Sequence, residues 1–378
     1  MKKSITCLLA GAMAAVMLAG CGSSAPETTT APETTAEAAA AETSVEKSEE
    51  ETTIAEADTS EAETEANAGE ETPEAADSGE GTAVRVGSLK GPTSMGLVFL
   101  MEMAEEGKAA NQYDFTMVTA ADELLPKVIS GDVDIALIPA NVASVLYNKT
   151  QGQISVIDIN TLGVLYVVAS DDSIQSMEDL KGRTIYMTGK GTTPDYVFQY
   201  LLSANGLSES DVTLEFKSEA AEVAALLKEQ PDAIGVLPQP FVTAACAQNE
   251  ALKIVLDLTK EWDDAQKEGG SRLVTGVTVV RNEFLEEYPD AVEAFLKEHE
   301  KSAAYVDDQV DQAAELVAKT GIIEKAPVAK KALPYCNITC ITGNEMKDAL
   351  SGYLQVLFDQ DPTSVGGKLP EDDFYYVK

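Results

Sequence analysis

Two stretches of the sequence decide the fold: "GSLKGPTSMGLVFL" at residues 87–100 and "MTGKGTTPDYVFQYLL" at residues 187–202. Each follows a short run that contains β-branched residues, passes through a loop of glycine, threonine, serine and proline, and then enters a longer apolar run. A strand, a loop of this kind and a helix, in that order, are the unit from which α/β proteins are built. The sequence therefore predicts the same strand–loop–helix unit twice.

A second pair of matching stretches lies further along each half. Residues 133–145 read "VDIALIPANVASV" and residues 232–244 read "DAIGVLPQPFVTA", so that both pairs of predicted strands and helices meet at a proline. The interval from Gly91 to Pro139 is 48 residues, and the interval from Gly191 to Pro238 is 47. Shared loop chemistry, element order and spacing indicate two structurally similar lobes.

Strands and helices alternate through both series. We predict a strand at 83–89, a helix at 95–108 and further alternation to residue 147, and the same order again from residue 184. The segment from Ala83 to Lys378 has 296 residues, which is more than a single hydrophobic core usually accommodates. Its length therefore also favours two lobes. Ligands of open α/β sheets bind beyond the carboxyl ends of the strands, so we expect the four matched loops to share one cleft. Their N–H groups and helix dipoles would suit an anionic or strongly polar ligand.

The N-terminal part predicts export and a tether. Residues 1–21 carry two lysines, an apolar core and small residues, as secretory signals do, and their last four, "LAGC", resemble the lipobox of bacterial lipoproteins. That resemblance implies a lipid such as palmitate on Cys21 and membrane attachment through the lipid alone. Residues 22–82 hold 18 acidic residues, one lysine and no aromatic residue, which predicts a disordered acidic linker.

The charge of the remaining chain excludes one class of partner. Residues 83–378 contain 24 basic and 46 acidic residues, a net charge of −22. Nucleic acid needs a basic face, so no nucleic-acid partner is expected.

Four segments resemble one protein family. "LKGPTSMGL", "LIPANVASVLY", "MEDLKGRTIYMTGKGTTPDYVFQYLL" and "VLPQPFV" are similar to the nitrate/sulfonate/taurine branch of the solute-binding proteins of ABC importers, a branch that includes binders of thiamine-precursor pyrimidines. The resemblance covers nearly all of residues 84–358. It implies a type II periplasmic-binding-protein fold, with mixed sheets flanked by helices and two crossover strands near 163–170 and 273–280. Lobe I would then comprise 83–165 plus 276–378, and lobe II 166–275, with Gly163 and Gly276 as hinge points.

Other chemistries find little support. A phosphate-binding Walker loop fails, because six residues separate Gly182 from Gly189 and Gly191 stands where a Ser or Thr is required. The single histidine, His299, lies in the charged stretch "FLKEHEKSAAY" and is predicted to be solvated. One histidine makes a His-rich metal site and a Ser–His–Asp triad improbable, so we predict no catalytic residue, no metal and no cofactor.

The cysteines leave one alternative open. Cys336 and Cys340, in "YCNITC", are predicted either to form a local disulfide or to remain two free thiols. Cys246 is predicted to be a small core residue of a helix.

The candidate ligand-binding residues come from the matched loops, the hinges and nearby aromatic positions. Trp262, the only tryptophan, is either a surface anchor or a ring that stacks on the ligand, as aromatics in the family often do. Of the nearby cations, Lys90, Lys190 and Arg272, each is also consistent with a solvent-facing side chain, and the β–α loop at Gly191 is also consistent with a plain polar connection. The predicted set is Lys90, Thr93, Ser94, Met95, Pro139, Asn141, Gly163, Gly191, Thr192, Thr193, Tyr196, Gln239, Phe241, Trp262 and Gly276.

Together these features predict a monomeric, non-enzymatic solute receptor that closes on a small polar, anionic or heteroaromatic molecule and presents it to a permease. It would face the outside of the cell membrane or the periplasm. Two alternatives stay open: an enzyme on the same scaffold, acting on pyrimidine or menaquinone precursors, and a ligand-sensing surface lipoprotein.

Overall fold

The computed structural model describes residues 81–267 and 270–377. The predicted signal, the lipidation site Cys21 and nearly all of the acidic linker lie outside these residues. In the part of the chain that is described, no helix combines the length and the apolar character needed to span a membrane.

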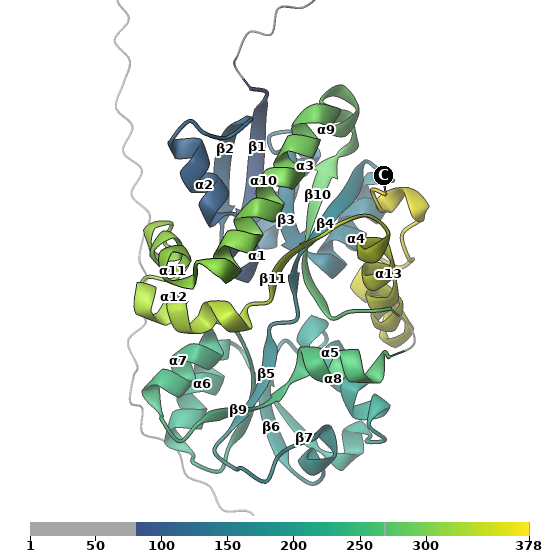
Figure 1. The fold of residues 1–378 in the computed structure, drawn as a ribbon. Helices are drawn as coiled ribbons and strands as arrows, with labels where there is room; N and C mark the ends of the chain where they lie inside the picture. Colours follow the sequence, from purple (N-terminus) through teal and green to yellow (C-terminus); the bar gives the residue numbers. More distant parts are fainter. Residues whose placement is uncertain (1–80, 268–269, 378) are drawn as a thin grey trace, which may run out of the picture. The chain divides into compact units, whose positions relative to one another are not determined.

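Two β-sheets organise the described chain (Figure 1). The first sheet, which defines lobe I, has six strands in the order β11-β4-β10-β3-β1-β2. Their bounds are β1 Ala83–Leu89, β2 Gln112–Val118, β3 Ile135–Pro139, β4 Ile154–Leu162, β10 Val274–Arg281 and β11 Ile338–Ile341.

The second sheet, which defines lobe II, has five strands in the order β7-β6-β8-β5-β9. Their bounds are β5 Leu165–Ala169, β6 Thr184–Thr188, β7 Thr213–Lys217, β8 Ile234–Pro238 and β9 Lys253–Asp257.

The two sheets repeat one arrangement. In lobe I, β1 pairs in parallel with β2 and β3, and β10 lies antiparallel to both β3 and β4. In lobe II, β6 pairs in parallel with β7 and β8, and β5 lies antiparallel to both β8 and β9. The α/β prediction is confirmed, and the repeat seen in the sequence corresponds to a repeat of strand order.

The chain crosses from one lobe to the other twice, and each crossing leads into an antiparallel strand. β4 of lobe I runs through Gly163 and Val164 directly into β5 of lobe II, and the chain after β9 passes through α8 and returns to lobe I as β10. Each sheet therefore contains one strand, β10 in lobe I and β5 in lobe II, that the chain reaches by crossing from the other lobe. The two crossings fall close to the positions predicted for the crossover strands.

Helices follow the strands in the expected order. In lobe I, α1 and α2 follow β1, α3 follows β2 and α4 follows β3; in lobe II, α5, α6, α7 and α8 follow β6, β7, β8 and β9. The bounds are α1 Pro92–Met95, α2 Val98–Glu105, α3 Ala121–Ser130, α4 Ala140–Thr150, α5 Thr193–Ala204, α6 Ala220–Glu229, α7 Phe241–Gln248, α8 Leu258–Ala265, α9 Asn282–Glu287, α10 Pro289–Asp308, α11 Val310–Lys319, α12 Ala326–Ala332 and α13 Gly343–Gln360.

One predicted helix is divided. The single helix expected over 95–108 is instead two helices, α1 and α2, separated at Gly96 and Leu97. Gly96 lies where a Cβ atom would be only 3.1 Å from Ile338 Cγ2 and 3.2 Å from His299 Nε2. The break therefore coincides with a close contact between this segment, β11 and α10, which glycine makes without crowding its neighbours.

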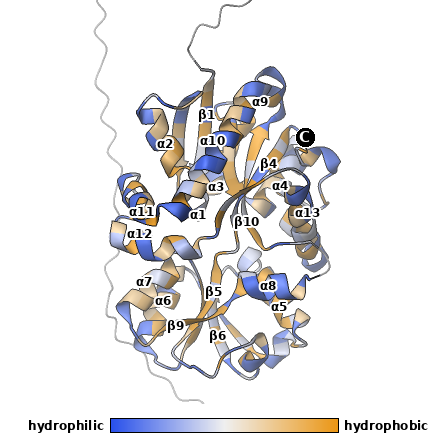
Figure 2. Ribbon diagram, in the orientation of Figure 1, coloured by the Kyte–Doolittle hydropathy of each residue, from blue (hydrophilic) through white to orange (hydrophobic). Residues whose placement is uncertain are grey.

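Apolar residues of the strands and of the inner helix faces form the core, as the colouring of Figure 2 shows. β4 departs from this pattern. All nine of its residues are buried, although four of the nine in "ISVIDINTL" are polar at Ser155, Asp158, Asn160 and Thr161. Buried polar groups need hydrogen-bond partners, so the polar side chains of β4 are expected to be hydrogen-bonded to other buried groups of lobe I.

Candidate functional site

The four matched loops lie between strands and helices, as predicted. The loops after β1 and β6 open α1 and α5, and the prolines that end β3 and β8 precede α4 and α7. Lobe I brings three predicted site residues together, because Gly276 of β10 pairs with Pro139 of β3, and a Cβ at Gly276 would lie 2.6 Å from Thr93 Cγ2. The same Cβ would lie 2.4 Å from Asn160 Oδ1, which adds a residue that the sequence analysis missed.

Most side chains of the β1–α1 loop are hydrogen-bonded or buried within lobe I. Thr93 Oγ1 donates to Leu89 O at 3.1 Å, and Ser94 Oγ lies 2.5 Å from the same carbonyl oxygen. Ser94 and Met95 are fully buried, and Met95 packs in the core formed with α10, α11 and α12. Lys90 is exposed. Thr93 therefore remains the member of this loop that is closest to Gly276.

A chain of buried hydrogen bonds runs through lobe I from Thr161 on β4 to His299 on α10. Thr161 Oγ1 donates to Asn160 Oδ1 at 2.9 Å, and Asn160 Nδ2 donates to Thr278 Oγ1 at 3.2 Å. Thr278 Oγ1 donates to Asp158 Oδ1 at 2.8 Å, and Asp158 Oδ2 lies 3.1 Å from His299 Nδ1. All five side chains are buried.

The prediction that His299 is solvated is wrong. Its side chain has no exposed surface and faces Asp158 from α10. The charged neighbours of His299 in the sequence belong to the outer face of α10, whereas position 299 shares the inner face with Phe295, Ser302 and Val306. The spacing of apolar residues at 292, 295, 303 and 306 was the available signal for this inner face.

In lobe II, the loop before α5 is partly filled by a side chain of its own helix. The buried Asp195 accepts a hydrogen bond from Gly191 N at 2.8 Å, and Thr192 Oγ1 donates to Gly189 O at 2.6 Å. Thr193 is half-buried at the first position of α5. An acidic side chain at a helix N-terminus takes the place that an anion would occupy. The α5 terminus therefore suits an anionic ligand less than the sequence suggested.

Two buried polar atoms flank the crossover at Gly163 and Val164 without a partner among the described residues: Gln239 Nε2 and Thr259 Oγ1. Gln239 follows β8, and Thr259 is the second residue of α8, which follows β9. The strands β8 and β9 are the neighbours of β5 on its two sides. Gln239 Oε1 accepts from Thr243 Oγ1 at 2.8 Å, which orients the amide so that Nε2 faces away from α7. A Cβ at Gly163 would lie 2.2 Å from Thr259 Oγ1.

The predicted aromatic residues are in different environments. Trp262 has no exposed surface, and its ring centroid lies 4.6 Å from that of Tyr200 and 5.6 Å from that of Tyr353, so the surface-anchor alternative is wrong. Its Nε1 donates to Ser271 Oγ at 3.3 Å. Phe241 is 39% exposed at the start of α7. Stacking of Trp262 on a ligand stays a prediction.

Several remaining candidates already have partners. Asn141 Nδ2 donates to Ser364 O at 3.3 Å, Lys190 Nζ lies 5.6 Å from the ring centroid of Phe216, and Arg272 Nε pairs with Asp263 Oδ1 at 3.2 Å. The hinge roles of Gly163 and Gly276 stay predictions. A Cβ atom at either glycine would lie 2.2 Å or 2.4 Å from a neighbouring side chain. This close packing by itself explains why glycine stands at both positions.

Cys246, Cys336 and Cys340 are free thiols, so the disulfide alternative for Cys336 and Cys340 is wrong. Cys336 points into the core with its Sγ 3.3 Å from Ala332 O, and burial raises its pKa to about 12. Cys246 is half-buried on α7 rather than fully inside the core.

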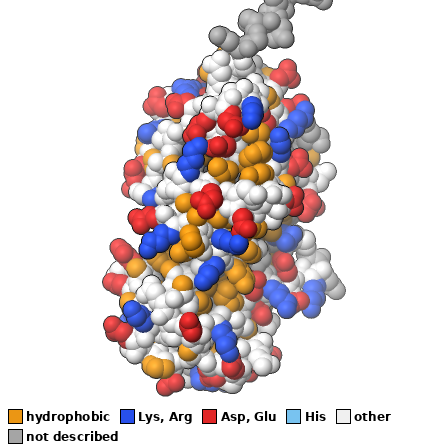
Figure 3. Space-filling model, turned by 60° about the vertical axis from the view of Figure 1, so that its left-hand side comes forward, with side chains coloured by type: hydrophobic (Ala, Val, Ile, Leu, Met, Phe, Trp, Pro, Cys, Tyr) orange, Lys and Arg blue, Asp and Glu red, His pale blue; other side chains and the backbone are white. Residues whose placement is uncertain are grey.

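A cavity of about 550 Å³ lies between the lobes beside this region. α7 of lobe II contributes Thr243 and Cys246, and the short helical turn Leu333–Tyr335 of lobe I contributes Pro334 and Tyr335. Figure 3, which turns the side of α7 and α12 forward, shows apolar and Lys or Arg side chains together at mid-height on this face. Thr243 thus links the cavity wall to the amide of Gln239.

Comparisons with known proteins agree with this architecture. A family model described as "NMT1/THI5 like" matches residues 149–313. A protein of Brucella abortus named as a binding protein is 24% identical over 237 residues, which cover 61% of this chain and 70% of the relative. The structure of an ABC transporter protein from Parabacteroides distasonis is 24% identical, with a TM-score of 0.66 over 79% of this chain and 99% of that chain.

The periplasmic aliphatic sulphonate binding protein SsuA from Escherichia coli is 17% identical and has a TM-score of 0.60, over 78% of this chain and 96% of its own. This TM-score over most of both chains shows a shared fold, which in this chain consists of two lobes, each with a mixed sheet flanked by helices. The chain therefore has the type II periplasmic-binding-protein fold, and its residues 149–313 match the NMT1/THI5-like family model.

Proposed function

We propose that this chain is the solute-binding component of an ABC importer and captures a small polar molecule between its lobes at the Gly163–Val164 crossover. The observation that carries the proposal is the pair of unpartnered buried atoms, Gln239 Nε2 and Thr259 Oγ1, on the two sides of that crossover. An unsatisfied buried polar group costs roughly 1–3 kcal/mol. A ligand that offers hydrogen-bond acceptors there would remove this cost.

The charges near the crossover favour a neutral heteroaromatic ligand over a strong anion. Asp195 already accepts from Gly191 N, and the nearby cations Lys190 and Arg272 face Phe216 and Asp263. An amide N–H and a hydroxyl suit a ring nitrogen or a carbonyl oxygen. On the lobe I side, Thr93 and Asn160 beside Gly276 provide further neutral polar groups.

The proposal includes a cellular setting. The predicted signal and Cys21 would place the protein outside the membrane on a lipid anchor, with residues 22–82 as a tether. Its partners would be the ligand and the permease subunits, and it would act as a monomer without catalysing a reaction.

The test begins with identification of a ligand. Native mass spectrometry of the purified protein reports any molecule that co-purifies, and a thermal-shift panel compares pyrimidines with sulfonates, carboxylates and amino acids. Binding should also compact the protein in small-angle X-ray scattering, because hinge closure brings the lobes together. No thermal shift and no compaction with any of the four classes would contradict the proposal.

Variants locate the site. We expect Gln239→Leu and Thr259→Val each to weaken binding about tenfold, because each removes one hydrogen bond to the ligand. Thr320→Val is the matched control, since Thr320 Oγ1 donates to Leu316 O and Val317 O of α11 in lobe I. Binding that is equally strong in all three variants would exclude the crossover as the site.

A further inference from the structure

Three side chains that can bind a metal converge in lobe I, away from the crossover. Asp158 lies on β4, His299 on α10 and Cys340 on β11. One carboxylate oxygen, one ring nitrogen and the thiol sulfur all lie within 4.8 Å of one another. Asp158 and His299 are fully buried and Cys340 is half-buried. The three residues are 41 or more positions apart in sequence, so only the fold brings them together.

The polar groups of this cluster are incompletely satisfied. His299 Nε2 is buried and has no hydrogen-bond partner among the described residues. Asp158 accepts from Thr278 Oγ1 and faces His299 Nδ1. The ring nitrogen that faces the carboxylate is Nδ1, on the other side of the ring from Nε2. A divalent cation held by Asp158 Oδ2, Nδ1 and the thiol would balance the charge of the buried carboxylate.

The surroundings resemble the outer shell of a metal site. Thr278 Oγ1 orients the Asp158 carboxylate at 2.8 Å, and Asn160 Nδ2 in turn donates to Thr278. Hydrogen bonds of this kind fix metal-binding carboxylates and tune their affinity. The carboxylate is therefore held in place before any cation arrives.

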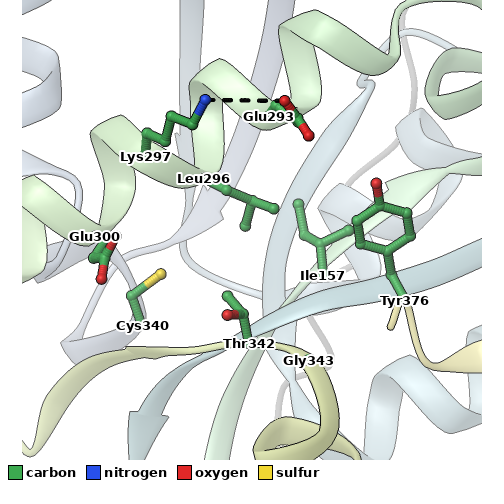
Figure 4. A pocket seen from close by; sticks show the side chains of 9 residues that line it. All are labelled: Ile157, Glu293, Leu296, Lys297, Glu300, Cys340, Thr342, Gly343 and Tyr376. Carbon is green, nitrogen blue, oxygen red and sulfur yellow. Dashed lines mark ion pairs between the residues drawn. The ribbon is translucent and has the colours of Figure 1, made fainter. Parts of the chain in front are cut away.

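A cavity leads to the cluster. Its volume is about 320 Å³, and Cys340, Glu300, Thr342 and Ile157 contribute to its wall. Figure 4 shows Cys340 and Glu300 next to each other at one end of the cavity, below Leu296 of α10. A cation can reach the thiol from this side, and Glu300 offers a carboxylate near it.

We propose that Asp158, His299 and Cys340 bind one divalent metal ion of the zinc class, with the fourth position open toward the cavity and Glu300. Sulfur, imidazole and carboxylate together are the donor set of Zn²⁺, whereas Mg²⁺ and Ca²⁺ take oxygen donors. Zinc bonds of about 2.0–2.3 Å require donor atoms roughly 3.3–3.7 Å apart in a tetrahedron. The separation of 3.1 Å between Asp158 Oδ2 and His299 Nδ1 is close to this, and rotation of the Cys340 side chain adjusts the sulfur.

Binding would change the state of the thiol. Burial, Asp158 and Glu300 all raise the pKa of the Cys340 thiol. A thiol that coordinates zinc is deprotonated, so zinc uptake would release a proton. The chain of hydrogen bonds from Asp158 to Asn160 would also connect the occupied site to the region of Gly276.

The test uses the full chain, stripped with a chelator and dialysed against Zn²⁺ or Co²⁺. We expect one Zn²⁺ per chain by elemental mass spectrometry. The Co²⁺ form should show a sulfur-to-cobalt charge-transfer band in the near ultraviolet and the intense visible bands of a tetrahedral complex. Cys340→Ser should lose the charge-transfer band and lower the affinity for Zn²⁺ at least tenfold. Cys246→Ser is the matched control, because Cys246 lies on α7 in lobe II.

A second measurement needs no variant. Zn²⁺ should slow alkylation of Cys340 in the wild-type chain, measured by peptide mapping, and leave that of Cys246 unchanged. A Co²⁺ spectrum without the sulfur band, Zn²⁺ binding that is unchanged in Cys340→Ser, or no protection of Cys340 would each overturn the proposal. None of these readouts involves the transported ligand, so the importer proposal and the metal proposal succeed or fail separately.

Discussion

The phenol of Tyr196 donates a hydrogen bond to Asp361 Oδ2 at 2.8 Å and so joins the two lobes. Tyr196 belongs to α5 in lobe II, whereas Asp361 follows α13, which packs against α4 and β4 of lobe I. Gln360 Nε2 adds a second bond across the same boundary, to Tyr196 O at 2.7 Å. The end of α13 and the residue that follows it therefore connect lobe II to lobe I.

The first prediction concerns this contact. Tyr196→Phe removes the hydroxyl that bonds to Asp361, and we expect the ligand-free protein to shift toward a more open arrangement of the lobes. The measurement is the radius of gyration by small-angle X-ray scattering. Tyr200→Phe is the matched control on the same helix, because the Tyr200 hydroxyl accepts from Gln266 Nε2 within lobe II. An unchanged radius in Tyr196→Phe would show that this hydrogen bond does not hold the lobes.

The second prediction concerns Gly276. An alanine there would place its Cβ 2.4 Å from Asn160 Oδ1 and 2.6 Å from Thr93 Cγ2, so at least one of these side chains must move. We expect Gly276→Ala to lower ligand affinity and also the free energy of unfolding, by about 1–3 kcal/mol. Titration calorimetry and urea unfolding measure the two effects. Gly276→Ala with unchanged ligand affinity would place the ligand elsewhere.

The third prediction uses Trp262, which is the only tryptophan. Because its ring is fully buried between Tyr200 and Tyr353, we expect fluorescence emission at short wavelength. Tyr353 belongs to α13 and Ser271 to the segment that returns to lobe I, so ligand-driven movement of the lobes should change the emission. Trp262→Ala should cost about 3–5 kcal/mol of stability. Emission typical of water-exposed tryptophan would contradict the packing.

The fourth prediction concerns a buried carboxylate in lobe I, that of the residue immediately before β3. Asp134 is 1% exposed and accepts from Arg85 Nε at 2.8 Å and from Arg281 Nη2 at 3.2 Å. Asp134→Ala leaves both guanidinium groups without this partner, and we expect a loss of about 1–3 kcal/mol in urea unfolding. Asp114→Ala, at an exposed position of β2, should change stability by less than about 0.5 kcal/mol. Equal effects of the two substitutions would contradict this role of Asp134.

The fifth prediction is the pH dependence of the same group. Burial alone would raise the pKa of Asp134, but the hydrogen bonds from Arg85 and Arg281 outweigh burial and hold the pKa below its usual value of 3.8. A carboxyl whose pKa is lower in the folded state stabilises the protein above pH 3.8, and this contribution is lost as the pH falls through the folded-state pKa. We expect Asp134→Asn to reduce the loss of stability that the wild type shows below about pH 4. An identical acid profile in Asp134→Asn would refute this assignment.

The sequence by itself determined the order of the elements in both halves. The Gly-rich loops at 91 and 191 and the prolines at 139 and 238 mark the ends of strands and the starts of helices, because loop chemistry acts within a few residues. The spacing between these markers was enough to predict two α/β lobes, and their sheets share one strand order.

Only the tertiary structure decided which distant residues meet. Neither local spacing nor composition states that β4 and β10 lie side by side, and that pairing brings Asp158 next to Thr278, with His299 above them on α10. For the same reason Trp262, in a polar stretch of sequence, lies fully buried against α5 and α13. Periodicity shows which face of a helix turns inward, but the partner of that face depends on contacts between residues that lie far apart in the sequence.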